Sequence, residues 1–291
     1  MATTLNGTIG RFGLFGAITA AVLSVTAPVF GAGGEGPETD APASTLEIAY
    51  DLYVGGIPLG KVAMSARFQG ADYKAISTLE TKGIVSAFWQ AKIEASSSGL
   101  AAPGRLQPSL YDSFSLNRSV QRRHATLTFG PDGPKSLQSD PPYEDSRYPV
   151  SEDQRKRTLD PLSAAVYLTS AANAAQGKPC DAAAPIFDGR RRYDVTFSYV
   201  KKTDVRMDNG LYSGPALVCQ IHYNQIAGYQ QSIIEQNKKF PKMYAWVVSA
   251  KSTSDPSRSY SLPVRVWAET EYGIVVALAS QIKLDGQPLG R

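Results

Sequence analysis

Residues 46–54 read LEIAYDLYV, with apolar side chains at every even position. Alternation of this kind places the even positions on one face of an extended chain, which is typical of a half-buried β-strand. Turn residues follow at 55–60, and residues 62–68 then repeat the alternation before a second turn leads into a strand that begins at Tyr73. Strands joined by such short turns predict an antiparallel meander.

The same pattern continues along the rest of the chain. It predicts further strands at 90–97, 109–116, 120–129, 193–200, 215–223, 243–250, 261–269 and 272–284. Hydrophobic residues make up 43% and charged residues 19% of the 291 residues, so the chain should bury a core. We expect a mainly β fold with a single strongly curved antiparallel sheet, an open or nearly closed barrel. A two-sheet sandwich is the alternative.

One helix is expected within this β-rich chain. Asp160 is a good N-cap and Pro161 suits the first helical position, so the helix should begin there and continue to about residue 175. We expect the 161–175 helix to pack at the mouth of the curved sheet. Residues 83–89 suggest a further helical turn, and residues 131–159, rich in Pro, Asp and Ser, predict a long surface connection.

The first 32 residues differ from the rest and predict a signal peptide. Arg11 precedes a short apolar run that ends in small residues. Residues 33–45 are expected to form a disordered spacer and residues 46–291 a single β-rich domain. The expected location is periplasmic, after cleavage of the signal; an uncleaved membrane anchor is the alternative.

Cys180 and Cys219 are the two cysteines of the chain, and both belong to the part expected to be exported. An even pair in an oxidising compartment predicts a disulfide, whereas in the cytosol two buried thiols would be more common. The predicted export therefore favours a bond between them.

No motif in the sequence predicts catalysis, a metal site or a cofactor. The two histidines, His124 and His222, lie in different predicted strands and lack zinc-site spacing. The sequence has no nucleophile elbow and no glycine-rich phosphate loop. The expectation is a protein that is not an enzyme.

The most unusual segment is FDGRRRYD at residues 187–194. Its Asp-Gly pair predicts a tight hairpin turn. Arg190, Arg191 and Arg192 are candidates for contact with an anion, since guanidinium groups bind carboxylate or phosphate with two hydrogen bonds. Successive residues of a strand point to opposite faces, however, so the three cannot all converge.

Several segments together resemble a known family. They are YDLYVGG at 50–56, DPLSA at 160–164, FDGRRRYD at 187–194, PVR at 263–265 and the two cysteines. This set resembles the DUF3108 family of uncharacterised proteobacterial envelope proteins, which implies an exported β-rich domain without an established activity. By layout alone the chain is also similar to lipoprotein carriers, whose curved sheet is covered by helices.

The functional expectation is a non-catalytic envelope protein that binds an apolar or amphipathic ligand, such as a lipid, or that acts in envelope assembly with other envelope proteins. The expected pocket lies between the helix and the sheet, lined by Leu162, Val166, Phe197 and Trp246. A net charge of +4 is small for this length and does not indicate nucleic-acid binding. A secreted hydrolase with an unrecognised site is the alternative.

Overall fold

The structure is a computed structural model that describes residues 43–81, 91–117, 122–143, 148–170, 178–236, 241–270 and 273–289. The described residues all belong to one compact unit, residues 41–291. The predicted signal peptide, the helical turn at 83–89 and the end of the helix beyond residue 170 lie outside the described residues. The predicted spacer ends earlier than expected, because the first strand already begins at Ala43.

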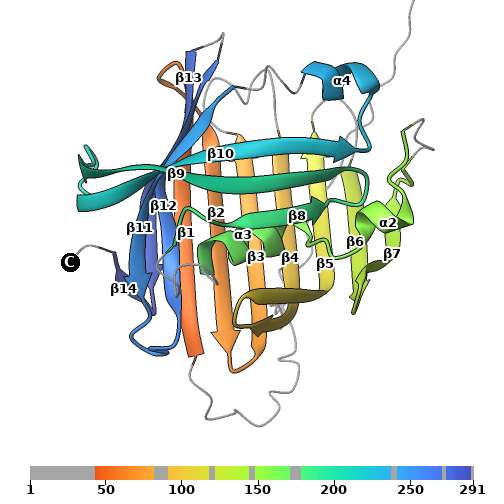
Figure 1. Cartoon of the computed structure of the whole chain (residues 1–291), viewed down its shortest axis with the longest axis horizontal. Helices are drawn as coiled ribbons and strands as arrows, with labels where there is room; N and C mark the ends of the chain where they lie inside the picture. Colours follow the sequence, from red (N-terminus) through yellow and green to blue (C-terminus); the bar gives the residue numbers. More distant parts are fainter. Residues whose placement is uncertain are drawn as a thin grey trace, which may run out of the picture. The chain divides into compact units, whose positions relative to one another are not determined.

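The described chain is dominated by one antiparallel sheet of 14 strands (Figure 1). Its strands are β1 (Ala43–Val54), β2 (Ile57–Gln69), β3 (Asp72–Thr81), β4 (Ala91–Ala102), β5 (Arg105–Asn117), β6 (Arg122–Gly130), β7 (Gly133–Asp140), β8 (Ala183–Phe187), β9 (Arg192–Arg206), β10 (Ser213–Ala227), β11 (Met243–Lys251), β12 (Ser259–Thr270), β13 (Gly273–Leu284) and β14 (Gln287–Pro288). The helices are α2 (Glu152–Arg155), α3 (Pro161–Ser170) and α4 (Gln231–Gln236).

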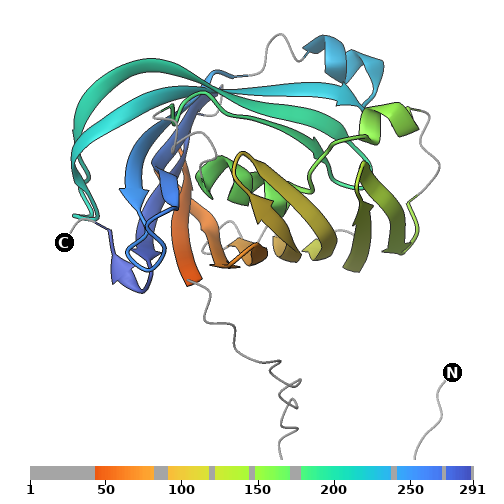
Figure 2. The same ribbon diagram turned by 60° about the horizontal axis from the view of Figure 1, so that its bottom comes forward.

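The order of the strands confirms the single curved sheet and excludes the sandwich. From edge to edge the order is β7-β6-β5-β4-β3-β2-β1-β13-β12-β11-β10-β9-β8, and β14 pairs with β13. Strands β7 and β8 are therefore the two edges, and the sheet does not close through a β7–β8 pair. Figure 2 shows the sheet curling around α3, with the long β9–β10 hairpin arching over the top.

Three strands were not predicted: β7, β8 and the two-residue β14. Strand β7, with the sequence GPKSLQSD, lies inside the stretch interpreted as a long surface connection, so that interpretation is wrong for its first part. A single apolar side chain, Leu137, leaves no alternation to detect, and the strand forms because it pairs with β6. Strand β8, AAPIF, is short and contains Pro185, which suits an edge position.

Helix α3 fills the interior of the curl. It contacts β3, β4 and β5 on one wall and β8 and β12 on the other. The side chains of Ala164 and Val166 are each 1% exposed, and those of Leu162 and Leu168 are also buried. The helix lies deeper than the mouth position expected from sequence, because both walls of the sheet supply apolar side chains to it. The largest of these are Phe68, Tyr73, Phe187, Tyr260 and Leu262.

The segment between β7 and α3 covers one open edge of the sheet. Leu159 forms a parallel bridge with Ile186 of β8, through hydrogen bonds from the Leu159 N–H to the Pro185 carbonyl and from the Phe187 N–H to the Leu159 carbonyl. These bonds satisfy backbone groups that an uncovered edge strand would expose. The edge at β8 is thereby protected from pairing with another chain.

Asp285, in the turn after β13, links this turn by hydrogen bonds to the start of β1 and to residues 252–254 after β11. One carboxylate oxygen accepts hydrogen bonds from the Ser44 hydroxyl and the Thr45 N–H, each at 2.9 Å. The other accepts from the Ser252 hydroxyl at 2.7 Å and from the N–H groups of Thr253 and Ser254. Burial opposes ionisation, but these bonds outweigh it and lower the pKa of Asp285 to about 2.

Replacing Asp285 by Ala should therefore lower the free energy of unfolding by about 2 kcal/mol, because the buried donors lose a charged acceptor. Urea denaturation at pH 7 measures the loss. Asp285→Asn is the matched control: it keeps one acceptor oxygen and tolerates the left-handed backbone, with φ of 52°, so its loss should be smaller. Equal stability of the Ala variant and the unmodified protein would contradict the role assigned to this carboxylate.

Candidate functional site

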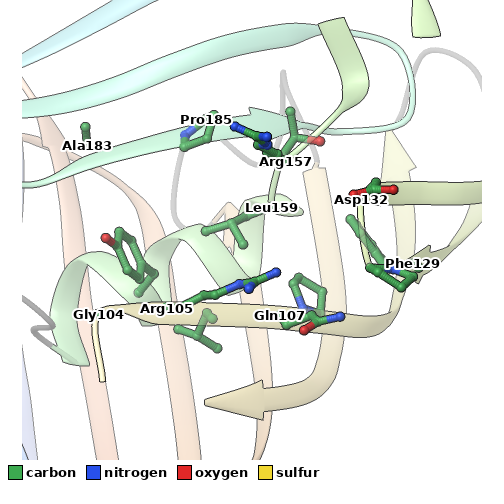
Figure 3. A pocket seen from close by; sticks show the side chains of 16 residues that line it. Gly104, Arg105, Gln107, Phe129, Asp132, Arg157, Leu159, Ala183 and Pro185 are labelled. Carbon is green, nitrogen blue, oxygen red and sulfur yellow. The ribbon is translucent and has the colours of Figure 1, made fainter. Parts of the chain in front are cut away.

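A cavity of about 490 Å³ opens at the end of the sheet where the β4–β5 and β6–β7 hairpins turn (Figure 3). Its walls come from three places: the start of β5, the β6–β7 turn, and the segment that joins α2 to α3. Tyr167 of α3 and Pro185 of β8 complete the lining. We call it the mouth cavity. Its volume falls within the usual range for small-molecule sites.

Part of the wall of the mouth cavity is apolar and part is polar. Leu106 and Leu159 are buried residues of the main core that also line the cavity, and the ring of Phe129 packs against the same core. Pro108 and Pro185 add further apolar surface. These side chains form an apolar strip along which an apolar chain could lie.

Two arginines also line the mouth cavity. In Figure 3, Arg105 extends beneath Leu159 and Arg157 lies above it. Both residues are exposed, and neither side chain forms an ion pair with a described carboxylate. Asp132, from the β6–β7 turn, is the acidic residue of the lining, so the lining carries one more positive charge than negative.

The backbone at Arg157 is strained but held in place. Its φ of 57° lies in the left-handed region that non-glycine residues seldom adopt. The Arg157 N–H donates to the Asp132 carbonyl at 2.7 Å, and the Thr158 hydroxyl donates to the Arg155 carbonyl at 2.7 Å. These bonds fix the position of Arg157 against the β6–β7 turn, and strain maintained in this way is common at functional sites.

A second cavity, of about 650 Å³, adjoins the first. Both are lined by Gly104, Arg105, Leu106 and Tyr167, so these residues separate the two spaces. The second cavity has its own arginine, Arg258, but Asp255 pairs with it at 3.0 Å and the Gly70 carbonyl accepts from it at 2.8 Å. Of the two arginines without a described anion partner, Arg157 lines the mouth cavity alone and Arg105 lies between the two cavities.

A buried polar cluster surrounds the start of α3, deeper in the molecule. The carboxylate of Asp160, which is fully buried, accepts hydrogen bonds from the Ser163 N–H, as an N-cap does, and from the hydroxyls of Ser163 and Ser97. The Tyr73 and Ser163 hydroxyls lie 2.8 Å apart. Burial raises the pKa of Asp160 to about 6, although hydrogen bonds from Ser163 and Ser97 offset part of the effect. No described cation pairs with this carboxylate.

The family of the chain is given by its sequence profile. The profile of the family described as "Protein of unknown function (DUF3108)" matches residues 49–280. The chain belongs to the DUF3108 family. Among curated proteins the comparison finds no match.

The fold of this DUF3108 domain is similar to a solved structure described as a beta-barrel-like protein of the domain of unknown function DUF1849 from Brucella abortus. The TM-score is 0.51 at 9% sequence identity, and the alignment covers 84% of this chain and 98% of the other. At this identity the likeness concerns the fold alone. It supports the barrel-like architecture of the DUF3108 domain and leaves its activity open.

The four residues expected to line one pocket in this DUF3108 domain are not brought together. Leu162 and Val166 are buried inside the core between α3 and the sheet. Phe197 lines a cavity of about 420 Å³ beside the disulfide. Trp246 lines a different cavity of about 400 Å³. These four residues therefore do not share a pocket, because Leu162 and Val166 lie on the packed face of α3; on this helix it is Tyr167 that lines the mouth cavity.

The three arginines of the FDGRRRYD segment also point to different surroundings. Arg192 pairs with Asp194 at 2.7 Å and donates to the Gln154 carbonyl. The guanidinium of Arg191 lies over the ring of Tyr229, 5.3 Å from its centroid. Arg190 is exposed. The Asp188 carboxylate accepts the N–H groups of Arg190 and Arg191, so this segment is a hydrogen-bonded turn rather than a converging anion site.

The predicted disulfide between Cys180 and Cys219 is formed, with Cα atoms 5.4 Å apart. Cys219 is completely buried beside Ala245 and Val247. A disulfide indicates that the DUF3108 domain matures in an oxidising compartment. Within the described residues, no helix is both apolar and long enough to cross a bilayer.

Each histidine has one polar neighbour. His222 Nε2 lies 2.9 Å from the Ser198 hydroxyl, and His124 Nε2 lies 2.7 Å from the Asp112 carboxylate. The two pairs lie on different strands and do not combine into one triad. No group of three or more His, Cys, Asp or Glu side chains in the described part of the chain could hold a metal ion.

Sequence reasoning missed Arg105 and Arg157. Arg105 follows the Pro103-Gly104 turn, and Arg157 belongs to the basic run 155–157, within the stretch predicted to be a surface connection. Each is an ordinary surface arginine when considered alone. Their common cavity arises because the sheet curls until β5 and the segment before α3 are neighbours, which no local pattern predicts.

Proposed function

We propose that this protein is an exported, non-catalytic envelope protein that binds an amphipathic anion, such as a single-chain fatty acid, in the mouth cavity. The observation that carries the proposal is that apolar side chains and two arginines that lack a described anion partner line the same cavity. A ligand carboxylate would accept hydrogen bonds from Arg105 and Arg157. Its chain would lie against Leu106, Phe129 and Leu159.

Export to the periplasm after removal of a signal peptide is part of the proposal. It is supported by the disulfide, which forms in oxidising compartments, and by the apolar run after Arg11. A carrier of apolar chains is useful in such a compartment, because the chain of a free fatty acid exposes apolar surface to water, which is unfavourable.

Calorimetric titration with dodecanoate tests the binding. We expect saturable binding to the purified protein, weakened at least about tenfold by Arg105→Ala, because a charge-assisted contact is lost. Arg190→Ala is the matched control: it removes an equally exposed arginine from outside the cavity and should leave the affinity unchanged. Dodecyltrimethylammonium, with the same chain and a cationic head, should not bind.

Two results would contradict the proposal. One is an absence of saturable dodecanoate binding to the folded protein. The other is an equal loss of affinity in the Arg105→Ala and Arg190→Ala variants, which would place the anion outside the mouth cavity. Circular dichroism of each variant shows that a loss of binding is not a loss of fold.

A hydrolase is the second candidate, favoured by the contact between Ser198 and His222. A serine nucleophile also needs a group that orients the histidine and donors for the oxyanion. No described carboxylate bonds to His222, and both residues are exposed. Hydrolysis of a p-nitrophenyl ester by the protein, abolished by Ser198→Ala, would favour this candidate over a non-catalytic role.

A further inference from the structure

The cavity of about 400 Å³ that Trp246 lines lies far from the mouth cavity in the sheet and has a different chemistry. It is bounded by the β1–β2 turn, by the tip of the β9–β10 hairpin and by side chains of β11, β12 and β13. We call it the Arg265 pocket, after the residue of β12 in its wall. The residues that line it include Tyr53, Arg206, Asp208, Trp246, Arg265 and Val276.

The β9–β10 hairpin forms a fixed wall of the Arg265 pocket. Figures 1 and 2 show this hairpin extending past β11 and curling down beside the sheet. The Asn209 side-chain amide donates to the Ala279 carbonyl of β13 at 2.7 Å, and the side chain of Met207 is only 4% exposed. The pocket is therefore preformed, which reduces the entropic cost of binding.

Arg265 is held between two tryptophans. Its guanidinium carbon lies 4.9 Å from the centroid of the Trp246 ring and 5.3 Å from that of Trp267. The two indole rings pack edge to face, and Tyr244 stacks on Trp267. This aromatic cage holds the guanidinium in one orientation, so little side-chain entropy remains to be lost when a ligand binds.

The charge of Arg265 is not neutralised by the described part of the protein. Its Nε is buried without a hydrogen-bond partner, and no described carboxylate forms an ion pair with it. Asp208 lines the same pocket, but Arg206 beside it carries the opposite charge. With Arg265 the lining has a net positive charge. A buried polar group without a partner calls for an explanation, such as a ligand that the protein normally holds.

We propose that the Arg265 pocket binds a small organic anion, a carboxylate or phosphate monoester with a compact apolar body. The anion would accept hydrogen bonds from the guanidinium of Arg265, a residue of the pocket wall. The apolar body would contact Ile274, Val276 and Leu278, whose side chains form the adjacent wall. This site is independent of the mouth cavity and of the function proposed for it.

Tryptophan fluorescence reports directly on this pocket, because two of the three tryptophans of the chain flank Arg265. The probe is cyclohexanecarboxylate, which carries an anion on an apolar ring and does not absorb light at the wavelengths that excite tryptophan. We expect a saturable change in fluorescence with this probe. Cyclohexanol, with the same ring but no charge, and inorganic phosphate, with charge but no ring, should each bind at least about tenfold more weakly.

Two variants separate this proposal from a structural role of Arg265. Arg265→Gln should lower the affinity for cyclohexanecarboxylate at least about tenfold. Arg105→Ala, in the mouth cavity, should leave this affinity unchanged. Should Arg265→Gln fail to fold, Arg206→Gln changes an exposed residue at the pocket wall and should still reduce the affinity. The proposal is overturned if the folded protein gives no saturable signal. It is also overturned if the Arg265→Gln protein, or the Arg206→Gln protein used in its place, binds the probe as tightly as the unmodified protein does.

Discussion

Replacing Cys180 and Cys219 together by Ala is expected to lower the free energy of unfolding by about 4 kcal/mol, the largest effect of any change considered. The bond joins residues separated by 39 positions, and a closed loop of this length strongly restricts the unfolded chain. Removing both sulfurs leaves no free thiol that could form a wrong bond. Urea denaturation of the oxidised protein and of the double variant measures the difference.

Reduction provides the control for this prediction. Dithiothreitol should lower the midpoint of unfolding of the unmodified protein and leave that of the double variant unchanged. A double variant within about 1 kcal/mol of the oxidised protein would show that the disulfide contributes little, as happens when the reduced chain keeps residual structure.

Asp160 should make the protein less stable as the pH rises from about 4 to 7. Burial raises the pKa of this carboxyl to about 6 in the folded chain, against 3.8 for the free group. Below pH 4 it is protonated in both states. Above pH 6 it is ionised in both, and the folded chain bears the cost of the buried charge. The pKa difference corresponds to about 3 kcal/mol of unfolding free energy lost across this range.

Asp160→Asn isolates this effect, because an amide oxygen can still accept the Ser163 N–H and cap α3. Denaturation at pH 4.5 and 7.5 should show a smaller pH dependence of stability for Asp160→Asn than for the unmodified protein. Asp160→Ala is the matched control and should lose stability at both pH values, since the cap disappears. If Asp160→Asn and the unmodified protein have the same pH dependence, the buried carboxyl is not its source.

The sheet could be predicted from sequence because its signal is local. Alternation over 46–54 and 62–68 marks β1 and β2, and the Asp160-Pro161 pair marks the start of α3. The disulfide between the two cysteines was also predicted correctly, because the predicted export to an oxidising compartment favoured a bond. Strand β7 was missed because its sequence contains one apolar residue and depends on pairing with β6.

The candidate sites were far less predictable, because they depend on packing. Residues with small side chains, such as Ser163 and Ala164, are buried on α3 together with Val166, so this face of the helix is enclosed, whereas Tyr167 on another face lines the mouth cavity. A bulge at Val264 of β12 shifts the register between Trp246 and Val247 of β11, and the Trp246 side chain lines the Arg265 pocket. Periodicity predicts which side chains alternate, but not which partner each face will meet.

The position of β1 in the sheet also determines the order in which the protein can fold. Strand β1 lies between β2, its neighbour in sequence, and β13, so that Leu46 is paired with Leu284. The meander β1 to β7 needs only local contacts and can form early, whereas the contact between β1 and β13 joins distant parts of the chain. Such long-range pairing slows folding. A growing chain therefore keeps one edge of β1 unpaired until β13 has been synthesised, and during that interval the edge is available to chaperones and to aggregation.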